Sequence, residues 1–323
     1  ISTFERIAMT EQEEDRCTYP RFLKDARGNL LFTYRSGGSG NGSRFYNAYD
    51  PSLQTWDRFL TTPLFEGEGK RNAYPFGPIQ GPDNRFHVVW VWRDTPDCAT
   101  NNNLSYARSD DLKNWETAGG EAVELPLTLE QPKLCVDPVP SGGGIINGCE
   151  RLTFDADNRP VISYHKSDAD GHMQIFVARY EGKQWHRHAV TNWDKNVSFS
   201  GRGAMPFIGI RISGLKKLEA GLWSITYRHR DYGAGRIVLD AETLLPVERD
   251  VPVVPDHPKE LTRVTTDFKG ISVRLAQDLG SPKDPATKYV LRWEALGAHH
   301  DRPRDPPLPP ASVLSLVKLQ REK

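Results

Sequence analysis

Apolar and polar positions alternate in short runs along the chain. Three of these runs follow an aspartate in a polar turn, namely DARGNLLFTYR from Asp25, DNRFHVVWVWR from Asp83 and DADNRPVISYH from Asp155. Runs rich in β-branched and aromatic residues, entered through such a turn, are typical of β-strands. No stretch has the periodicity of a long amphipathic helix, and LTLEQPKL and GLKKLEAG can form single turns at most.

Two further landmarks repeat with these strands. An apolar element precedes each aspartate, in TYPRFL, NAYPFGPI and GCERLTF, and a tryptophan closes the segment that follows, at Trp56, Trp115 and Trp185. The repeat therefore consists of strand, turn, strand, loop, strand, turn, strand, which is the organisation of a propeller blade. Two less regular units follow, from GAMPFIGIRI to GRIVLDAETLLPV and from KGISVRLAQDL to SVLSLVKLQ. The pattern predicts an all-β β-propeller with about five recognisable blades, and a pair of β-sandwiches is the alternative.

The domain organisation follows from the same repeat. No internal boundary is evident, so residues 1–323 are expected to form a single β-propeller domain. The Pro-rich segment GAHHDRPRDPPLPPAS resembles a linker, but an alternating run follows it, which favours a long loop within the last blade. The opening ISTFERIAMT resembles the end of a preceding blade, so we expect N-terminal blades to be missing from this chain.

The charge balance narrows the range of partners. Lys and Arg number 42 and Asp and Glu number 42, so no net charge attracts nucleic acid or an anionic membrane surface. Apolar runs such as FHVVWVW are far shorter than the roughly 20 residues of a membrane-spanning helix. We expect neither nucleic acid nor membrane as a partner. The four cysteines lack the spacing of a zinc site and could form two disulfides or none.

Candidate site residues recur at one strand position. A basic or imidazole residue stands ten positions after each turn aspartate: Arg35, Arg93 and His165. Taken singly, each fits a solvated strand-end cation or a packed histidine, but equivalent positions in a propeller point into a shared cavity. Tyr19 and Tyr74 occupy matching places in the first strands, each followed by proline. An arginine close to such a tyrosine is expected to lower its pKa.

This set of residue types suits one reaction. Eliminative cleavage of a uronic acid requires neutralising the carboxylate, removing the proton α to it and protonating the leaving oxygen. Arginine serves the first task, and tyrosine or histidine the others. Glycosidases need two suitably separated carboxylates, whereas the turn aspartates normally bond their own backbone. The histidine pairs at 186 and 188 and at 299 and 300 are expected to be exposed, so we predict no metal and no cofactor.

At these residues the chain resembles the BNR-repeat (BNR_4-type) β-propeller family, which contains ulvan lyases and rhamnose-glucuronate lyases. The likeness is carried by EEDRCTYPRFL, LLFTYRSGGSGNG, YDPSLQTW, GEGKRNAYPFGP, HVVWVWRDTPD and LSYARSDDLKNW and extends through ISYHKSDADGHMQIFVARYEGKQW. It implies a seven-bladed propeller, with a catalytic tyrosine at Tyr19 and a carboxylate-neutralising arginine at Arg35. Tyr74 and Arg93 would line the pocket. The glycines after Arg35 are expected to let sugar approach the backbone closely.

The resemblance leaves part of the site open. His165 and Asn102 complete the predicted substrate-binding set. Asn102 lies where a histidine is expected from relatives. The family's catalytic histidines lie upstream, in SHN and NMH motifs, and these motifs have no counterpart in this sequence. The predicted function is that of a secreted or periplasmic polysaccharide lyase acting by β-elimination on an acidic glycan of the glucuronate- or iduronate-rhamnose type. The alternatives are a carbohydrate-binding propeller without catalysis and a glycoside hydrolase resembling an α-L-rhamnosidase.

Overall fold

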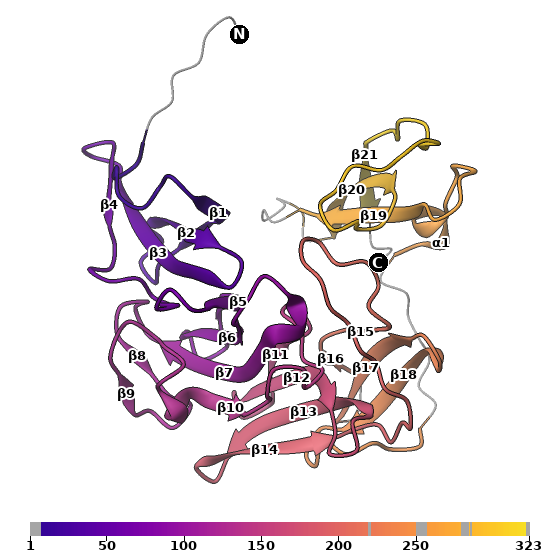
Figure 1. The fold of residues 1–323 in the computed structure, drawn as a ribbon, viewed down its shortest axis with the longest axis horizontal. Helices are drawn as coiled ribbons and strands as arrows, with labels where there is room; N and C mark the ends of the chain where they lie inside the picture. The colour runs from indigo at the N-terminus through magenta and orange to yellow at the C-terminus, as the bar shows by residue number, and fades with distance from the viewer. Residues whose placement is uncertain (1–7, 219–220, 250–256, 279–283, 285, 321–323) are drawn as a thin grey trace, which may run out of the picture. The chain divides into compact units, whose positions relative to one another are not determined.

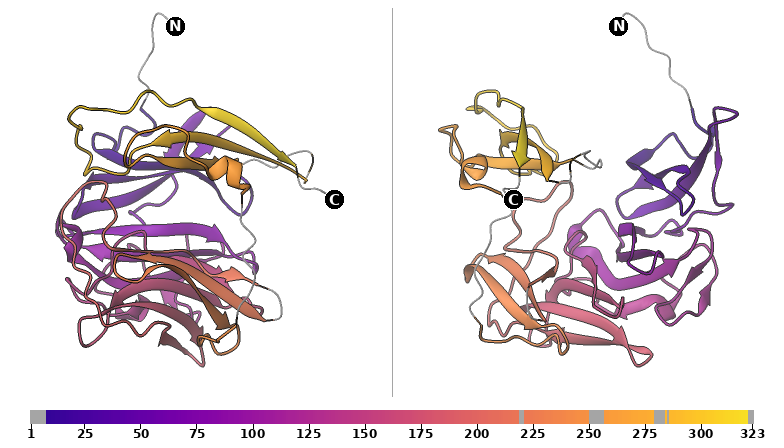
Figure 2. Two further views of the ribbon diagram at one scale, coloured as in Figure 1. Left: turned by 90° about the vertical axis from the view of Figure 1, so that its right-hand side faces the viewer. Right: turned by 180° about the vertical axis from the view of Figure 1, so that it is seen from behind.

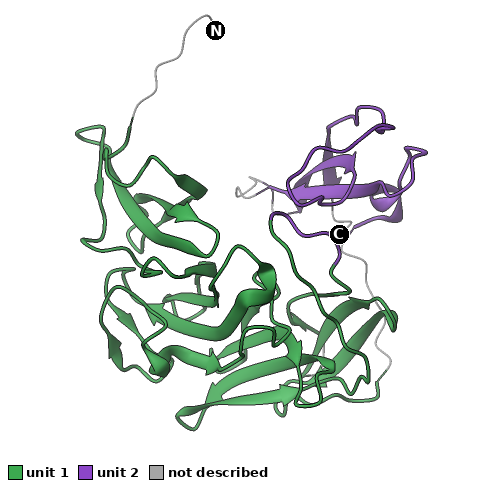
Figure 3. Cartoon of the chain, viewed as in Figure 1, with its two compact units in different colours: residues 1–202, 208–249 green, residues 203–207, 250–323 purple. Residues whose placement is uncertain are grey.

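The computed structural model describes residues 8–218, 221–249, 257–278, 284 and 286–320. The chain forms two compact units (Figure 3): unit 1 comprises residues 1–202 and 208–249, and unit 2 comprises residues 203–207 and 250–323. Strands dominate both units. Within the described part of the chain, no helix has the length and apolar character that crossing a membrane requires. The prediction of one domain spanning residues 1–323 stays a prediction.

The first blade of unit 1 is an antiparallel sheet of four consecutive strands (Figure 1). These are β1 (Cys17–Lys24), β2 (Leu30–Gly38), β3 (Asn41–Asp50) and β4 (Thr55–Arg58), in that order across the sheet. Turn chemistry explains their spacing. The carboxylate of Asp25 accepts the backbone N–H groups of Arg27 and Asn29, and that of Asp50 accepts the N–H of Ser52, so each aspartate closes its own turn.

Three further sheets follow in unit 1 (Figure 2), of which the third has the same consecutive order and the second and fourth depart from it. The second contains β5 (Asn72–Gln80), β6 (Phe86–Arg93), β7 (Asn101–Ser109), β8 (Trp115–Glu116), β9 (Ala122–Val123) and β10 (Cys135–Asp137), with short 3-10 turns at Cys98–Thr100 and Pro132–Leu134. The third contains β11 (Arg151–Phe154), β12 (Pro160–Ser167), β13 (Met173–Glu181) and β14 (Gln184–Ala189). The fourth contains β15 (Ile210–Ile212), β16 (Lys216–Lys217), β17 (Leu222–His229) and β18 (Gly233–Asp240).

Hydrophobic clusters join each sheet of unit 1 to the next. Strand β6 shows how, because alternate residues face opposite ways. Val88, Trp90 and Trp92 pack into a cluster with the first blade, whereas Val89 and Val91 pack into a cluster with the third. A further cluster joins the third and fourth sheets. A strand buried on both faces explains the unbroken apolar run FHVVWVW. Sheets packed face to face in succession confirm the predicted β-propeller fold.

Unit 2 contains a three-stranded sheet. Its strands are β19 (Ser272–Gln277), β20 (Thr287–Ala295) and β21 (Ser315–Gln320), and the one-turn helix α1 (Lys259–Thr262) precedes them. The Pro-rich segment 297–312 connects β20 to β21, as predicted. Of the two segments expected to form single turns at most, LTLEQPKL contains the 3-10 turn Pro132–Leu134, and GLKKLEAG contains β16.

Candidate active site

Arg35 lies near the end of β2 and contacts two tyrosine rings. Its guanidinium carbon lies 4.7 Å from the ring centroid of Tyr19 and 5.7 Å from that of Tyr74. Its Nη1 donates to the Tyr74 hydroxyl at 3.3 Å and its Nε to Oγ1 of Thr18 at 2.9 Å. The side chain is buried, so each cation–π contact is partly shielded from water. The two rings meet edge to face, with centroids 6.0 Å apart.

Tyr19 adopts an unusual backbone conformation. It lies where the β1–β2 register shifts between Thr18 and Arg21, its φ is +53°, and 55% of the residue is exposed. Positive φ is uncommon for a bulky residue and persists only where surrounding contacts hold it. The phenol is therefore accessible from solvent while its ring stays on the Arg35 guanidinium.

Arg93, the last residue of β6, also lies beside the ring of Tyr74. Its guanidinium carbon is 5.6 Å from the centroid of that ring, and its Nη1 donates to Oδ1 of Asn147 at 3.4 Å. Its remaining hydrogen bonds go to the main-chain carbonyls of Thr95, Pro96 and Gly201. The structure thus brings four of the predicted site residues together: Tyr19, Arg35, Tyr74 and Arg93.

The two arginines of this group are buried without an ion pair in the described part of the chain. No carboxylate there forms an ion pair with Arg35 or Arg93. A buried guanidinium without a counter-ion is energetically unfavourable and favours an anionic ligand. The planar guanidinium also matches the two oxygens of a carboxylate.

The two tyrosines differ in acidity. Burial, and next the neighbouring Tyr74, raise the pKa of Tyr19 and outweigh the charges of Arg35 and Arg93. Burial also acts to raise the pKa of Tyr74, but the hydrogen bond with Ser39 (2.8 Å) and the charges of Arg93 and Arg35 prevail and lower it. The arginines act to lower the pKa of both tyrosines, as expected, but only at Tyr74 is the net shift downward.

His165 and Asn102 do not contact this group. His165 is buried in β12, and its Nδ1 bonds the carbonyl of Gly144 at 2.9 Å, which makes Nδ1 the protonated nitrogen. Burial lowers its pKa to about 4, so the ring is neutral near pH 7. Asn102 donates to Oδ2 of Asp94 at 3.0 Å. Their predicted roles in substrate binding stay predictions.

Gly40, in the turn after Arg35, packs against the neighbouring blade. Gly40 has a φ of +74°, and a Cβ there would overlap the backbone of Thr95 in the second blade. Its N–H donates to Oδ1 of Asn72. At Gly40 the close approach is therefore made by protein backbone, and the expectation that the glycines after Arg35 admit sugar stays a prediction.

Three contributors to the site escaped sequence reasoning. Thr18 and Ser39 hold Arg35 and Tyr74, and Asn147 holds Arg93. Ser39 lies within the glycine-dense turn between β2 and β3, where nothing distinguishes it from an ordinary turn serine. Asn147 comes from a loop of the chain 54 residues beyond its partner. No local pattern marks either residue.

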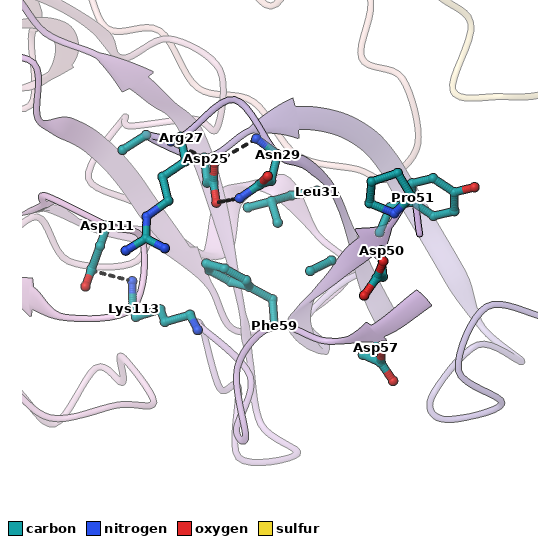
Figure 4. Close-up of a pocket in the computed structure, with 13 residues that line it drawn as sticks. Asp25, Arg27, Asn29, Leu31, Asp50, Pro51, Asp57, Phe59, Asp111 and Lys113 are labelled. Atoms are coloured by element: carbon teal, nitrogen blue, oxygen red, sulfur yellow. Dashed lines mark hydrogen bonds between the residues drawn. The ribbon is translucent and has the colours of Figure 1, made fainter. Parts of the chain in front are cut away.

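A cavity of about 530 Å³ lies at the other end of β2 (Figure 4). It is lined by Leu31, which is four residues or about 13 Å along the strand from Arg35. Asp25 and Asp111 also line it, and their carboxylates accept hydrogen bonds from their own turns. Carboxylates engaged in this way are poorly placed to act as a glycosidase pair, which agrees with the structural role expected of turn aspartates.

One group of described residues has the composition of a metal site. Ligand atoms of Asp168, Asp170 and His172, in the β12–β13 turn, lie within 4.8 Å of one another. The Asp168 carboxylate already accepts the backbone N–H groups of Asp170 and His172 and the side-chain amide of Gln174. These bonds explain the cluster as a turn.

Comparison with known proteins agrees with this fold. A curated ulvan lyase, the short isoform from Alteromonas sp. (strain LOR), is 27% identical over 187 residues, which are 51% of this chain and 35% of that protein. A solved ulvan lyase from a family of polysaccharide lyases has a TM-score of 0.54 at 14% identity, covering 85% of this chain and 62% of that one. The chain therefore spans about a third of its curated relative.

Two further solved structures resemble the chain. An ulvan lyase bound to -[GlcA(1-4)Rha3S]- gives a TM-score of 0.55 at 14% identity over 86% of this chain and 62% of that one. Polysaccharide lyase Uly1 gives 0.51 at 15% identity over 97% and 60%. The model of the BNR repeat-containing family matches residues 1–193. Since this match takes in more than half of the 323 residues, the chain belongs to the BNR repeat-containing family.

Proposed function

We propose that the protein is a polysaccharide lyase that cleaves a uronic-acid glycan of the glucuronate- or iduronate-rhamnose type by β-elimination. One observation carries the proposal: the buried Arg35 guanidinium contacts the rings of both Tyr19 and Tyr74 and has no carboxylate partner among the described residues. A uronate carboxylate supplies the missing negative charge and brings its α carbon close to two phenols. The named ulvan lyase relative supports the same chemistry.

The two tyrosines suit opposite halves of the elimination. Groups whose environments drive their pKa values apart are the natural base and acid of a reaction. Tyr74, with its lowered pKa, removes the proton α to the carboxylate. The electron pair forms a carbon–carbon double bond as the bond to the glycosidic oxygen breaks, and Tyr19, with its raised pKa, protonates that oxygen. Exchange of protons with water then restores both tyrosines.

Arg35 makes this proton removal feasible. An ionised carboxylate opposes the negative charge that develops beside it, so the guanidinium must neutralise it in the transition state. Arg93 contributes a second positive charge behind Tyr74 and favours the phenolate. Sulfated ulvan and a glucuronate-rhamnose gum are the substrates to test, with the appearance of an unsaturated uronate followed by ultraviolet absorbance. A folded protein that leaves every uronate polymer intact would contradict the proposal.

The Arg35 side chain is the first position to test by substitution. Arg35→Ala should lower kcat/KM by roughly 10²–10³-fold, as loss of a transition-state charge contact does. Arg35→Lys should recover little, because an ammonium lacks the planar fork. Arg58→Lys is a matched control, since Arg58 also lies over aromatic rings in the first blade, those of Tyr34 and Phe45. Equal losses from the Arg35 and Arg58 variants would point to general destabilisation.

A carbohydrate-binding propeller without catalysis is the second candidate. The position of His165 favours this candidate, because no histidine that the structure describes joins Tyr19, Arg35, Tyr74 and Arg93 as a proton carrier. His165 is buried and neutral near pH 7, and it lies outside that group. Calorimetry with uronate oligosaccharides that shows binding, combined with no product in the ultraviolet assay, would select this function. Release of saturated sugars would instead select a hydrolase.

A further inference from the structure

A second group of polar side chains lies beside Arg35 on the first blade. Strands β2 and β3 pair so that Thr33 is opposite Tyr46 and Arg35 is opposite Arg44. Residues opposite each other in an antiparallel pair share a face, as do residues two apart along a strand. All four side chains therefore leave the same face of the sheet. Tyr46 belongs to the hydrophobic cluster shared with the second blade, so this face is the one between the two blades.

Three atoms in this group lack a hydrogen-bond partner. Oγ1 of Thr33, Nε of Arg44 and the hydroxyl of Tyr46 are buried, and none bonds to any residue that the structure describes. An unsatisfied buried donor is destabilising, and native proteins usually satisfy such groups with an ordered water or an ion. Thr33 and Tyr46 are 2% and 1% exposed, so bulk water does not reach them.

The three side chains are close enough to influence one another. Burial raises the pKa of Tyr46, while the charge of Arg44 and the hydroxyl of Thr33 act against it. Tyr46 is thus within interaction range of both. The three orphan groups therefore lie together on one face of the sheet.

The charges nearby decide which ligand fits. Burial and the positive charges of Arg35 and Arg21 lower the pKa of Arg44. In the described part of the chain no carboxylate forms an ion pair with any of these three arginines, and Nη1 of Arg21 binds only the carbonyl of Gly77. A water molecule would satisfy the hydrogen bonds but would leave the positive charge of Arg44 uncompensated. An anion satisfies the hydrogen bonds and also compensates the charge.

We propose that Thr33, Arg44 and Tyr46 bind a small monovalent inorganic anion, of the size of chloride, between the first and second blades. The three unpartnered groups are an N–H and two hydroxyls, all of which can donate. The near-complete burial of Thr33 and Tyr46 favours a single-atom ion over a larger oxyanion. The ion would also relieve the repulsion between Arg35 and Arg44. The tests of this site measure stability and ion binding, so they can fail separately from the proposed lyase activity.

Thermal unfolding at constant ionic strength tests the proposal. Replacing methanesulfonate by chloride should raise Tm saturably, by roughly 2–4 °C, because the folded state alone binds the ion. Crystals soaked in bromide should show an anomalous peak beside Nε of Arg44. A Tm that does not respond to chloride, or a water molecule at this position in bromide-soaked crystals, would overturn the proposal.

Volume-conserving variants separate an anion site from a packing effect. Thr33→Val and Tyr46→Phe each remove one orphan hydroxyl, so both should be at least as stable as the parent protein without chloride. Both should lose most of the chloride-dependent rise in Tm. Tyr164→Phe is the matched control, because the buried Tyr164 hydroxyl has a partner in Asp137 at 2.6 Å. That variant should keep the full chloride response; an undiminished response in Thr33→Val and Tyr46→Phe would refute the assignment.

Discussion

At the scale of single residues, equivalent sequence positions acquire different chemistry. Tyr19 and Tyr74 both precede a proline in the first strand of a blade, and both lie beside arginine. Tyr19 sits at a register shift and is largely exposed, whereas Tyr74 is buried and bonded to Ser39. The resulting pKa values move in opposite directions. Tertiary contacts that sequence does not display determine which phenol is the better base.

The pH dependence of elimination follows from this difference. Activity should rise with pH as Tyr74 ionises, below the usual tyrosine pKa near 10, and fall where Tyr19 loses its proton, above it. Tyr74→Phe should remove the rising limb and Tyr19→Phe the falling limb. Each should lower kcat by roughly 10²–10⁴-fold. Steady-state kinetics across pH measures both limbs.

A tyrosine outside the group provides the control for these variants. Tyr49 packs against Trp56 in the first blade and makes no contact with Arg35. Tyr49→Phe should therefore keep both limbs of the pH profile. If Tyr19→Phe and Tyr74→Phe alter the same limb, the assignment of acid and base is wrong.

At the scale of elements, the β2–β3 hairpin fastens the site to the neighbouring blade. Its turn region contains Gly37 and Gly40, both at positive φ, and Gly40 abuts the backbone at Thr95. The hairpin turns at Ser39 and Gly40, and this turn contacts the segment that follows Arg93 at the end of β6. The contact therefore holds the strand end that carries Arg35 next to the one that carries Arg93.

Substitution of this glycine tests the contact. Gly40→Ala should lower the free energy of unfolding by about 2–4 kcal/mol. The added methyl group would clash with the backbone of Thr95, and alanine is also strained at a positive φ. Gly69→Ala is a matched control, since Gly69 has a φ of +70° but a methyl group added there would meet nothing within 4 Å. It should lose about 1 kcal/mol. Equal losses in urea denaturation would show that the contact with Thr95 is unimportant.

Features that repeat along the sequence could be predicted from it, whereas contacts that occur once in the fold could not. Alternation and turn aspartates predicted the strands of four sheets in unit 1, and recurrence of Arg35 and Arg93 placed both beside the tyrosines. Ser39 and Asn147 lie in irregular segments, so no periodicity marks them. The pairing of Arg44 with Arg35 could have been predicted from the sequence. The segment RSGGSGNGSR is nearly symmetric about its centre, so a hairpin there places the two arginines opposite each other.

At the scale of the whole molecule, positive charge is local. Lys and Arg equal Asp and Glu in number, so any attraction for an acidic polymer comes from local groups of arginines such as Arg35 and Arg93 and not from the net charge. In unit 1, separate hydrophobic clusters hold each pair of neighbouring sheets. Stability is therefore distributed over several interfaces, whereas the candidate site occupies one of them.

Cavities in different clusters should separate stability from activity. Ile225→Ala, between the third and fourth sheets, and Leu64→Ala, between the first and second, each truncate a fully buried side chain. Both should lower the free energy of unfolding by about 2–5 kcal/mol. Only Leu64→Ala should change kcat/KM of the folded protein. An equal kinetic defect in Ile225→Ala would show that the interfaces are coupled.

Arg93 is held mainly by main-chain oxygens, those of Thr95, Pro96 and Gly201. A carbonyl is present whatever side chain its residue carries. The side chains at these three positions can therefore change during evolution without displacing the guanidinium, provided that the loop backbones keep their conformation. In distant homologues, this arginine should keep its orientation even where the sequences of the surrounding segments are no longer recognisably similar.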